Sequence, residues 1–229
     1  MQKNTSTVSV AYMVMGILFC VCLIASNLFA TKQISFFGIS LTGGILVFPI
    51  SYIVNDCVSE VWGYKKARLL IWTGFVMNFF FVLMGALCDF IPGAPYYENN
   101  EGFHAVFGLA PRVAIASFCA FLAGSFLNAL VMSKMKVKSK GRHFSWRAIL
   151  STVVGESADS LIFFPLALGG VIPTEALLPM MIGQVVLKTI YEIIILPFTI
   201  HVVKYIKKHE GIDTYDTNIS YNPLKLKEL

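Results

Sequence analysis

Residues 8–30 read VSVAYMVMGILFCVCLIASNLFA, an apolar run that contains no charged side chain. A helix needs about 20 apolar residues to cross the hydrocarbon core of a bilayer. The run is too long for the apolar part of a cleavable signal peptide, and it lacks a clear small-residue cleavage site. We therefore expect it to remain in the protein as a first transmembrane helix.

Five further apolar runs follow along the chain, at residues 41–62, 69–90, 113–132, 146–170 and 178–203. Hydrophobic residues make up 56% of the chain and charged residues 14%, whereas about 25% of residues in soluble domains are charged. The sequence predicts an all-α membrane protein with six transmembrane helices within residues 1–210, followed by a polar, loosely ordered tail at residues 211–229.

The basic residues indicate how the helices are oriented. Fourteen of the 18 lysines and arginines precede the first run, follow the last, or lie in the second and fourth gaps, and Arg147 at the start of the fifth run brings the number on this side to fifteen. The third gap, residues 91–111, contains none. Because basic loops stay in the cytoplasm, we expect both termini there, in a multi-pass protein of a bacterial-type inner membrane. This distribution marks topology and does not indicate a nucleic-acid partner.

Ionisable side chains lie inside the runs, where each costs roughly 2.5–3.5 kcal/mol on insertion scales unless it finds a partner, a water-filled cavity or a proton. The second run contains Asp56, the fifth Glu156 and Asp159, and the sixth Lys188 and Glu192. The i, i+3 and i, i+4 spacings place each pair on one helix face. Such an excess of acids suits a substrate rich in hydrogen-bond donors, and equally a proton relay.

Several of these charges also have a purely structural interpretation. Lys188 and Glu192 would neutralise each other as an internal ion pair. Glu60 would lie at the cytoplasmic interface, and Arg112 would extend to the outer headgroups. Asp159 lies deep in its run, so a functional role is favoured for it.

Prolines and small residues add two expectations about packing. Prolines inside the second, fifth and sixth runs would bend or open those helices; they are Pro49, Pro165 and Pro197. A small-residue stripe in the fourth run is typical of packing or of a homodimer; it comprises Ala116, Ala120 and Gly124. The two halves also echo each other weakly, as in a 3+3 inverted repeat.

The segment from Phe48-Pro49 through Asp56 to Trp62-Gly63-Tyr64-Lys65-Lys66-Ala67-Arg68 resembles the queuosine precursor transporter family, also described as vitamin uptake transporters. Further matching features are Ser26-Asn27, Arg112 with Ala116-Ser117-Phe118, Asp159 and Lys188. The resemblance covers most of the chain. It implies six helices, uptake of a 7-deazaguanine precursor of queuosine, and a substrate site that includes Asn27, Asp56, Arg112, Ser117, Asp159 and Lys188.

The chemistry of such a base fits these residue types. One carboxylate accepts a ring N–H and an exocyclic amine together, and arginine, lysine or serine donates to the carbonyl. Glu156 and Glu192 are further substrate-binding candidates. Together with Glu60, they would either tune the substrate preference of this member or be incidental to binding. The flat face of the base needs an aromatic or apolar slot. Candidates for stacking, each more often a packing residue, are Phe48, Trp72, Phe164 and Tyr191.

Other classes of function remain to be weighed against a secondary carrier. A membrane substrate-binding subunit of an energy-coupling-factor vitamin uptake system would depend on a separate ATPase, because this chain lacks G-x-x-x-x-G-K-[ST]. An intramembrane enzyme is disfavoured, since H-E-x-x-H is absent and the histidines lie at or near the ends of the runs. We expect no catalytic residue, cofactor or metal, and we expect the five cysteines to be membrane-embedded thiols.

Overall fold

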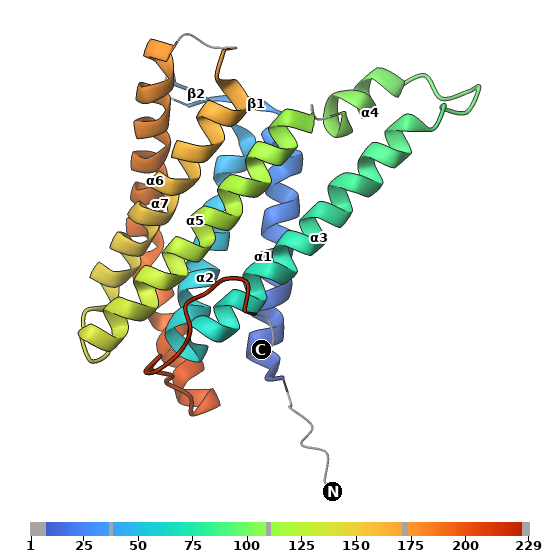
Figure 1. Ribbon diagram of the computed structural model, residues 1–229. Coiled ribbons are helices and arrows are strands. Elements are labelled where there is room, and N and C mark those ends of the chain that lie inside the picture. Colours follow the sequence, from blue (N-terminus) through green and yellow to red (C-terminus); the bar gives the residue numbers. More distant parts are fainter. Residues whose placement is uncertain (1–7, 37–38, 109–110, 171–173, 226–229) are drawn as a thin grey trace, which may run out of the picture.

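The computed structural model describes the chain except residues 1–7, 37–38, 109–110, 171–173 and 226–229. The regular elements of its described part are helices and one antiparallel pair of strands, β1 Gln33–Phe36 and β2 Ile39–Thr42. The helices in chain order are α1 Val10–Ala30, α2 Phe48–Trp62, α3 Tyr64–Phe90, α4 Asn100–Phe107, α5 Pro111–Lys138, α6 Phe144–Leu168 and α7 Thr174–Glu210 (Figure 1).

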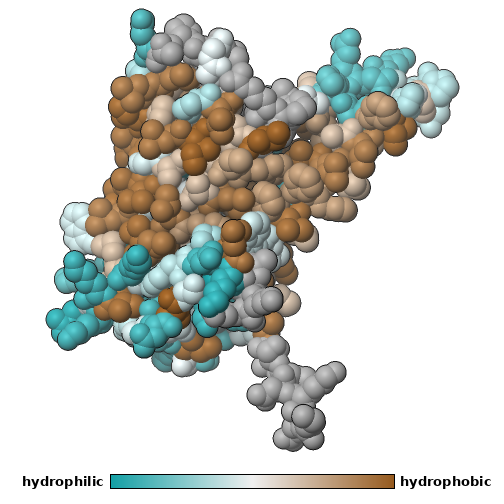
Figure 2. Space-filling model, viewed as in Figure 1, coloured by the Kyte–Doolittle hydropathy of each residue, from teal (hydrophilic) through white to brown (hydrophobic). Residues whose placement is uncertain are grey.

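Six of the described helical segments are long and apolar enough to cross a membrane, which confirms the predicted six spans. The short helix α4 and the β1–β2 hairpin, which the apolar runs did not predict, lie in connections between spans. Apolar side chains form a broad band across the middle of the molecule, and polar ones gather toward its ends (Figure 2). Such a band is expected where side chains contact lipid tails.

The second predicted span is a broken helix. A 3-10 turn, Gly43–Leu46, links β2 to α2, which begins only at Phe48. Pro49, expected inside a helix, therefore lies in the first turn of α2, where a proline costs no helical hydrogen bond. Pro165 and Pro197 do lie inside α6 and α7. Nearly every residue of α2 is buried, so this helix forms the centre of the bundle.

The helices α5 and α6 approach closely where two glycines face each other. A β-carbon added to Gly124 would lie 2.9 Å from the carbonyl oxygen of Gly155, and one added to Gly155 would lie 2.9 Å from that of Gly124. Ala116 and Ala120, which share the stripe with Gly124, are buried as well. The small-residue stripe thus packs within this chain.

The two ends of the bundle differ in composition. One end, here called the basic end, holds the α2–α3 and α5–α6 connections, the start of α1 and the end of α7 (bottom of Figure 1). The other, here called the hairpin end, holds β1, β2 and α4 (top of Figure 1). The basic end includes Lys65, Lys66, Lys134, Lys138, Lys140 and Arg142.

Residues 211–225 of the tail pack against the basic end, contrary to the expectation of a loosely ordered tail. The backbone N–H of Thr214 donates to the carbonyl of Val61 at 3.1 Å. Asp216 accepts the backbone N–H of Tyr64 at 2.8 Å, and the indole of Trp72 donates to the carbonyl of Pro223 at 2.9 Å. These bonds satisfy polar groups at the α2–α3 junction, which explains why a polar segment is held there.

Candidate functional site

A partly enclosed cavity of about 160 Å³ lies between α1, α3, α5, α6, α7 and the segment that enters α2. It lies in the half of the bundle nearer the hairpin end, since Asn27 comes three residues before the end of α1. An apolar cavity of about 150 Å³ holds one benzene molecule, so this space suits a small ring compound. Its polar lining residues are Ser26, Asn27, Asn78, Ser117, Asp159, Gln184 and Lys188.

One wall of the cavity carries a lysine between two acids. The Nζ atom of Lys188 lies 2.5 Å from Oε2 of Glu156 and 3.9 Å from Oδ2 of Asp159. The Glu156 side chain is 0% exposed and does not line the cavity, whereas the Asp159 side chain is 14% exposed and does. Glu156 therefore holds the lysine from behind, and Asp159 presents its carboxylate to the cavity.

The ion pair between Lys188 and Glu192, which the structural interpretation of these charges proposed, is absent from the described part of the chain. Lys188 instead pairs across the bundle with α6, through Glu156 and Asp159. Residues at i, i+4 on a helix lie near each other, but a shorter contact to a neighbouring helix takes the lysine away from Glu192.

A second polar contact in the cavity wall joins α1 to α3. The Nδ2 amide of Asn27 donates to Oδ1 of Asn78 at 2.7 Å, which leaves the amide N–H groups of Asn78 available to another acceptor. Asn78, like Gln184 on α7, was not among the predicted site residues. The signal that could have found both is an uncharged amide inside an apolar run, a group that also needs a partner in a membrane.

Aromatic side chains supply the apolar part of the wall. Of the four predicted stacking residues only Phe48 lines the cavity, with Lys188 Nζ 4.2 Å from the centre of its ring. Phe121 and Phe163, which the sequence did not single out, line it too. The remaining candidates, Trp72, Phe164 and Tyr191, are not lining residues.

The predicted polar residues divide into three groups by position. Asn27, Ser117, Asp159 and Lys188 meet at the cavity. The side chain of Arg112 lies outside the described residues. Asp56, Glu156 and Glu192 do not line the cavity and lie behind its wall.

Asp56 and Glu192 form a second polar layer, about one helical turn from the cavity toward the basic end. Asp56 is fully buried and accepts the hydroxyl of Ser151 at 3.2 and 3.3 Å. The carboxyl of Glu192 lies beside Asp56 and beside the hydroxyl of Thr152. No ion pair to either acid occurs within the described residues.

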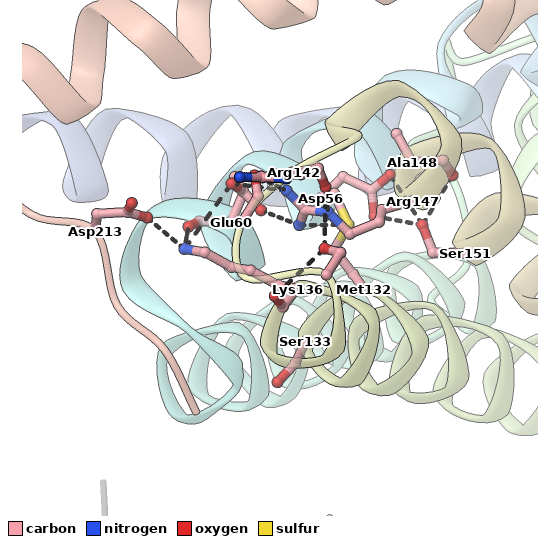
Figure 3. A network of polar contacts seen from close by, with 12 residues as sticks. Asp56, Glu60, Met132, Ser133, Lys136, Arg142, Arg147, Ala148, Ser151 and Asp213 are labelled. Atoms are coloured by element: carbon pink, nitrogen blue, oxygen red, sulfur yellow. Dashed lines mark hydrogen bonds and ion pairs between the residues drawn. The ribbon is translucent and has the colours of Figure 1, made fainter. Parts of the chain in front are cut away.

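A third layer at the basic end is an ion cluster around Glu60 (Figure 3). Both carboxylate oxygens of Glu60 accept from the guanidinium of Arg147, and Lys207 Nζ lies 2.6 Å from Oε1. Lys136 donates to the carbonyl of Glu60 and, at 2.5 Å, to Asp213. Glu60 is 1% exposed, so at this end of the bundle its carboxylate is held inside the protein by cationic partners.

Asp213 closes this cluster from the tail. Its partial burial alone would raise its pKa, but hydrogen bonds from Lys136 and Lys207 and the charges of these lysines outweigh burial and hold the pKa of Asp213 below its ordinary value. The carboxylate is therefore ionised near neutral pH and ties the tail to α5 and α7.

Residues 42–202 match a family model described as "Putative vitamin uptake transporter". The chain is 28% identical over 190 residues, 82% of each protein, to the "Probable queuosine precursor transporter" of Bacillus subtilis (strain 168). It is 26% identical over 147 residues, 62% of each protein, to the "Queuosine precursor transporter" of Escherichia coli (strain K12). No solved structure matches the chain.

These relatives and the family model describe transporters and not enzymes, in agreement with a helical bundle whose polar residues surround an internal cavity. Because the match covers most of the six membrane-spanning helices, this multi-pass membrane protein belongs to the "Putative vitamin uptake transporter" family.

Proposed function

We propose that this protein carries a 7-deazaguanine precursor of queuosine across the inner membrane of a bacterial-type cell as a secondary carrier. The names of its relatives support a queuosine precursor as the substrate. The observation on which the proposal rests is the cavity of about 160 Å³ in which the Asp159 carboxylate faces aromatic side chains.

The lining matches the edge and the face of a deazaguanine. Asp159 accepts the ring N–H and the exocyclic amine, a donor pair that one carboxylate binds with two hydrogen bonds. Ser117 and Lys188 donate to the carbonyl of the base. Its flat face packs against Phe48 or Phe163. A base that lacks the donor pair would leave the carboxylate unpaired, and this cost gives selectivity.

The positions of the three layers support an arrangement that is open toward the outside. The excess of lysine and arginine at the basic end supports a cytoplasmic location for that end and for both termini. The cavity then lies in the outer half of the membrane, and the Glu60 cluster with the tail closes the inner half. Transport requires this cluster to open after the base is bound, as in alternating access.

Uptake of a labelled deazaguanine base into liposomes that contain only this protein tests the proposal. We expect saturable uptake that excess unlabelled base inhibits, and that the Asp159→Asn variant loses. The matched control is Asp89→Asn, since Asp89 lies on α3 outside the cavity and pairs with exposed His104.

Two results would contradict the proposal. Binding of the base without uptake by the isolated protein would favour the alternative of a substrate-binding subunit that needs a separate ATPase. Failure of the wild-type protein both to bind and to take up the base would exclude a deazaguanine as substrate.

A further inference from the structure

The contact between Asp56 on α2 and Glu192 on α7 is the feature that the substrate site leaves unexplained. Asp56 is 0% and Glu192 3% exposed, and their carboxyl groups lie beside each other. Neither residue lines the cavity. Two carboxyl groups in contact inside a bilayer need a reason, because an uncompensated charge there is costly.

Within the described part of the bundle, the cations that form ion pairs do so with acids other than Asp56 and Glu192. Lys188 pairs with Glu156 and Asp159, and the three cations of the basic end pair with Glu60 or Asp213. Arg112 lies 16 positions before Asn128 on α5, which corresponds to roughly 24 Å of helix, and Asn128 is the α5 residue that contacts Asp56. No described cation therefore neutralises the Asp56–Glu192 pair.

Such a pair holds at least one proton, because two adjacent carboxylates in a dry interior cannot both be ionised. A second observation concerns the hydrogen bonds of Glu192. The hydroxyl of Thr152, which is 2% exposed, faces the carboxyl of Glu192, and Oε2 of Glu192 has no further hydrogen-bond partner within the described residues. Because buried polar groups are normally paired, this oxygen has room to accept a proton or a further hydrogen bond.

Ionisable neighbours surround the pair on each helix that packs against it. They are Tyr52, Cys57 and Glu60 on α2, Glu156 and Asp159 on α6, and Lys188 on α7, while α5 contributes the neutral Asn128. The position of the pair is intermediate. Glu192 follows cavity-lining Lys188 by four residues, and Asp56 precedes Glu60 of the ion cluster by four. The pair thus lies between the cavity and the cluster that closes the basic end.

We propose that the Asp56–Glu192 pair is a proton-binding site that couples substrate transport to the movement of protons. This inference rests on the proposed function and adds the driving ion. The pair takes up one proton from the hairpin-end side, and it releases one proton to the basic-end side after the change of access. No bond other than the carboxyl O–H forms or breaks.

The physical basis of the coupling is the cost of exposing a bare negative charge to the dry bundle. Alternating access shifts α7 relative to α2 and separates the two carboxyl groups. While both are protonated they part as neutral groups, but when a pair that shares one proton parts, one carboxyl keeps the proton and the other is left as a carboxylate without a partner. With substrate bound, the carrier therefore exchanges sides readily only when both groups are protonated, and the cycle closes when the empty carrier returns, more slowly, after one proton has left.

The test separates exchange of substrate from its accumulation. In the exchange assay, liposomes that contain the protein are loaded with unlabelled base, and labelled deazaguanine base is added outside. In the accumulation assay, the liposomes contain no base, and a proton gradient that is acidic outside drives uptake of the labelled base. We expect the wild-type protein to exchange and to accumulate the base, with proton entry reported by a pH-sensitive dye inside the liposomes. The Asp56→Asn, Glu192→Gln double variant should keep exchange within about threefold and lose accumulation. Glu175→Gln, an exposed acid in the first turn of α7, serves as the control and should keep both.

Three outcomes would overturn the inference. They are accumulation by the double variant, wild-type accumulation driven by a sodium gradient but not by a proton gradient, and wild-type exchange with no response to a proton gradient. Absence of exchange by the wild-type protein would instead refute the proposed substrate.

An infrared measurement keeps the inference testable if the variants fold poorly. At pH 7 the wild-type spectrum should contain a protonated-carboxyl band that is weaker in the single Glu192→Gln variant. An unchanged band in a folded variant, checked by circular dichroism, would show that the pair holds no proton.

Discussion

The cavity and the Glu60 cluster both place charged side chains inside the bundle, but they differ in how those charges are satisfied. Around Glu60, both carboxylate oxygens have cationic partners, and the tail covers the basic end. At the cavity, Asp159 reaches Lys188 only at 3.9 Å and keeps an exposed surface. A cluster in which every carboxylate has a close cationic partner holds helices together. A cluster in which a carboxylate lacks a close partner can still bind a ligand.

The balance of charge differs in the same way. The basic end combines three cations with Glu60 and Asp213. Nearer the cavity, Lys188 stands against four acids, which are Asp56, Glu156, Asp159 and Glu192. Excess negative charge in a bilayer is tolerable if protons or a donor-rich substrate compensate it. The contrast therefore assigns stability to one region and binding to the other.

The largest effect should come from removing Glu60. Glu60→Ala leaves the buried guanidinium of Arg147 without its carboxylate, and breaking a buried ion pair from one side costs about 3–5 kcal/mol. We expect a strongly lowered melting temperature in detergent or a failure to fold. Glu175→Ala, at an exposed position, should leave the melting temperature unchanged. Equal stability of the two variants would remove the structural role of the cluster.

A smaller loss of stability is expected where the tail meets α3. Asp216 accepts the Tyr64 N–H at 2.8 Å and the Ser133 hydroxyl at 2.5 Å. Asp216→Ala leaves the Tyr64 N–H unpaired, at a cost of about 1–3 kcal/mol, and leaves the Ser133 hydroxyl with only the Tyr221 hydroxyl as a partner. Limited proteolysis should cut the tail faster in this variant than in Thr217→Ala, which alters the exposed neighbour. Identical cleavage rates would mean that Asp216 does not hold the tail.

On the cavity side, Asn78→Ala should weaken binding without destabilising the protein much. It removes the amide partner of Asn27 and one polar group of the lining. Loss of one neutral hydrogen bond is worth about 0.5–1.5 kcal/mol, or roughly 2- to 13-fold in Kd. Titration of the purified variant with a deazaguanine base measures this, with Asn99→Ala, at an exposed position outside the cavity, as control. An unchanged Kd would place Asn78 outside the binding surface.

The smallest effect concerns the pH dependence of the tail contact. The pKa of Asp213 is lowered by Lys136 and Lys207, so the ionised side chain adds stability above the ordinary aspartate pKa, and this contribution is lost as pH falls through the lowered pKa. The side chain is 44% exposed, so solvent screens the contribution. Wild type should exceed Asp213→Asn in melting temperature at pH 7, and the difference should shrink in acid. A difference that grows in acid would reverse the assigned sign.

The spans could be predicted because the bilayer imposes one simple requirement on each of them. Any stretch such as residues 8–30 must be apolar and long enough to cross. The break before α2 escaped prediction, since Gly43 and Gly44 occur in a run whose overall hydropathy is that of a span. The ordered tail escaped as well, because its polar residues find partners only after α2, α3 and α5 have met.

The candidate site was predictable in part for a related reason. Asp159 and Lys188 stand out because charge in an apolar run is costly. Distances across the bundle decide which acid pairs with Lys188. The rotation of each helix decides whether Asn78 or Trp72 faces the cavity. Those distances are set by packing, such as the close approach of α5 and α6 at Gly124, and no spacing within one helix encodes them.

Titration calorimetry in detergent can measure how a 7-deazaguanine base binds to the purified wild-type protein and to the Asp159→Asn variant. This measurement decides whether the cavity at Asp159 is the substrate site. A carboxylate that accepts two hydrogen bonds at about 1.5–3 kcal/mol each gives at least a tenfold loss of affinity when it becomes an amide. We expect that loss with an unchanged melting temperature of the unliganded protein. Equal affinity of the two proteins for the base would contradict a substrate site at Asp159.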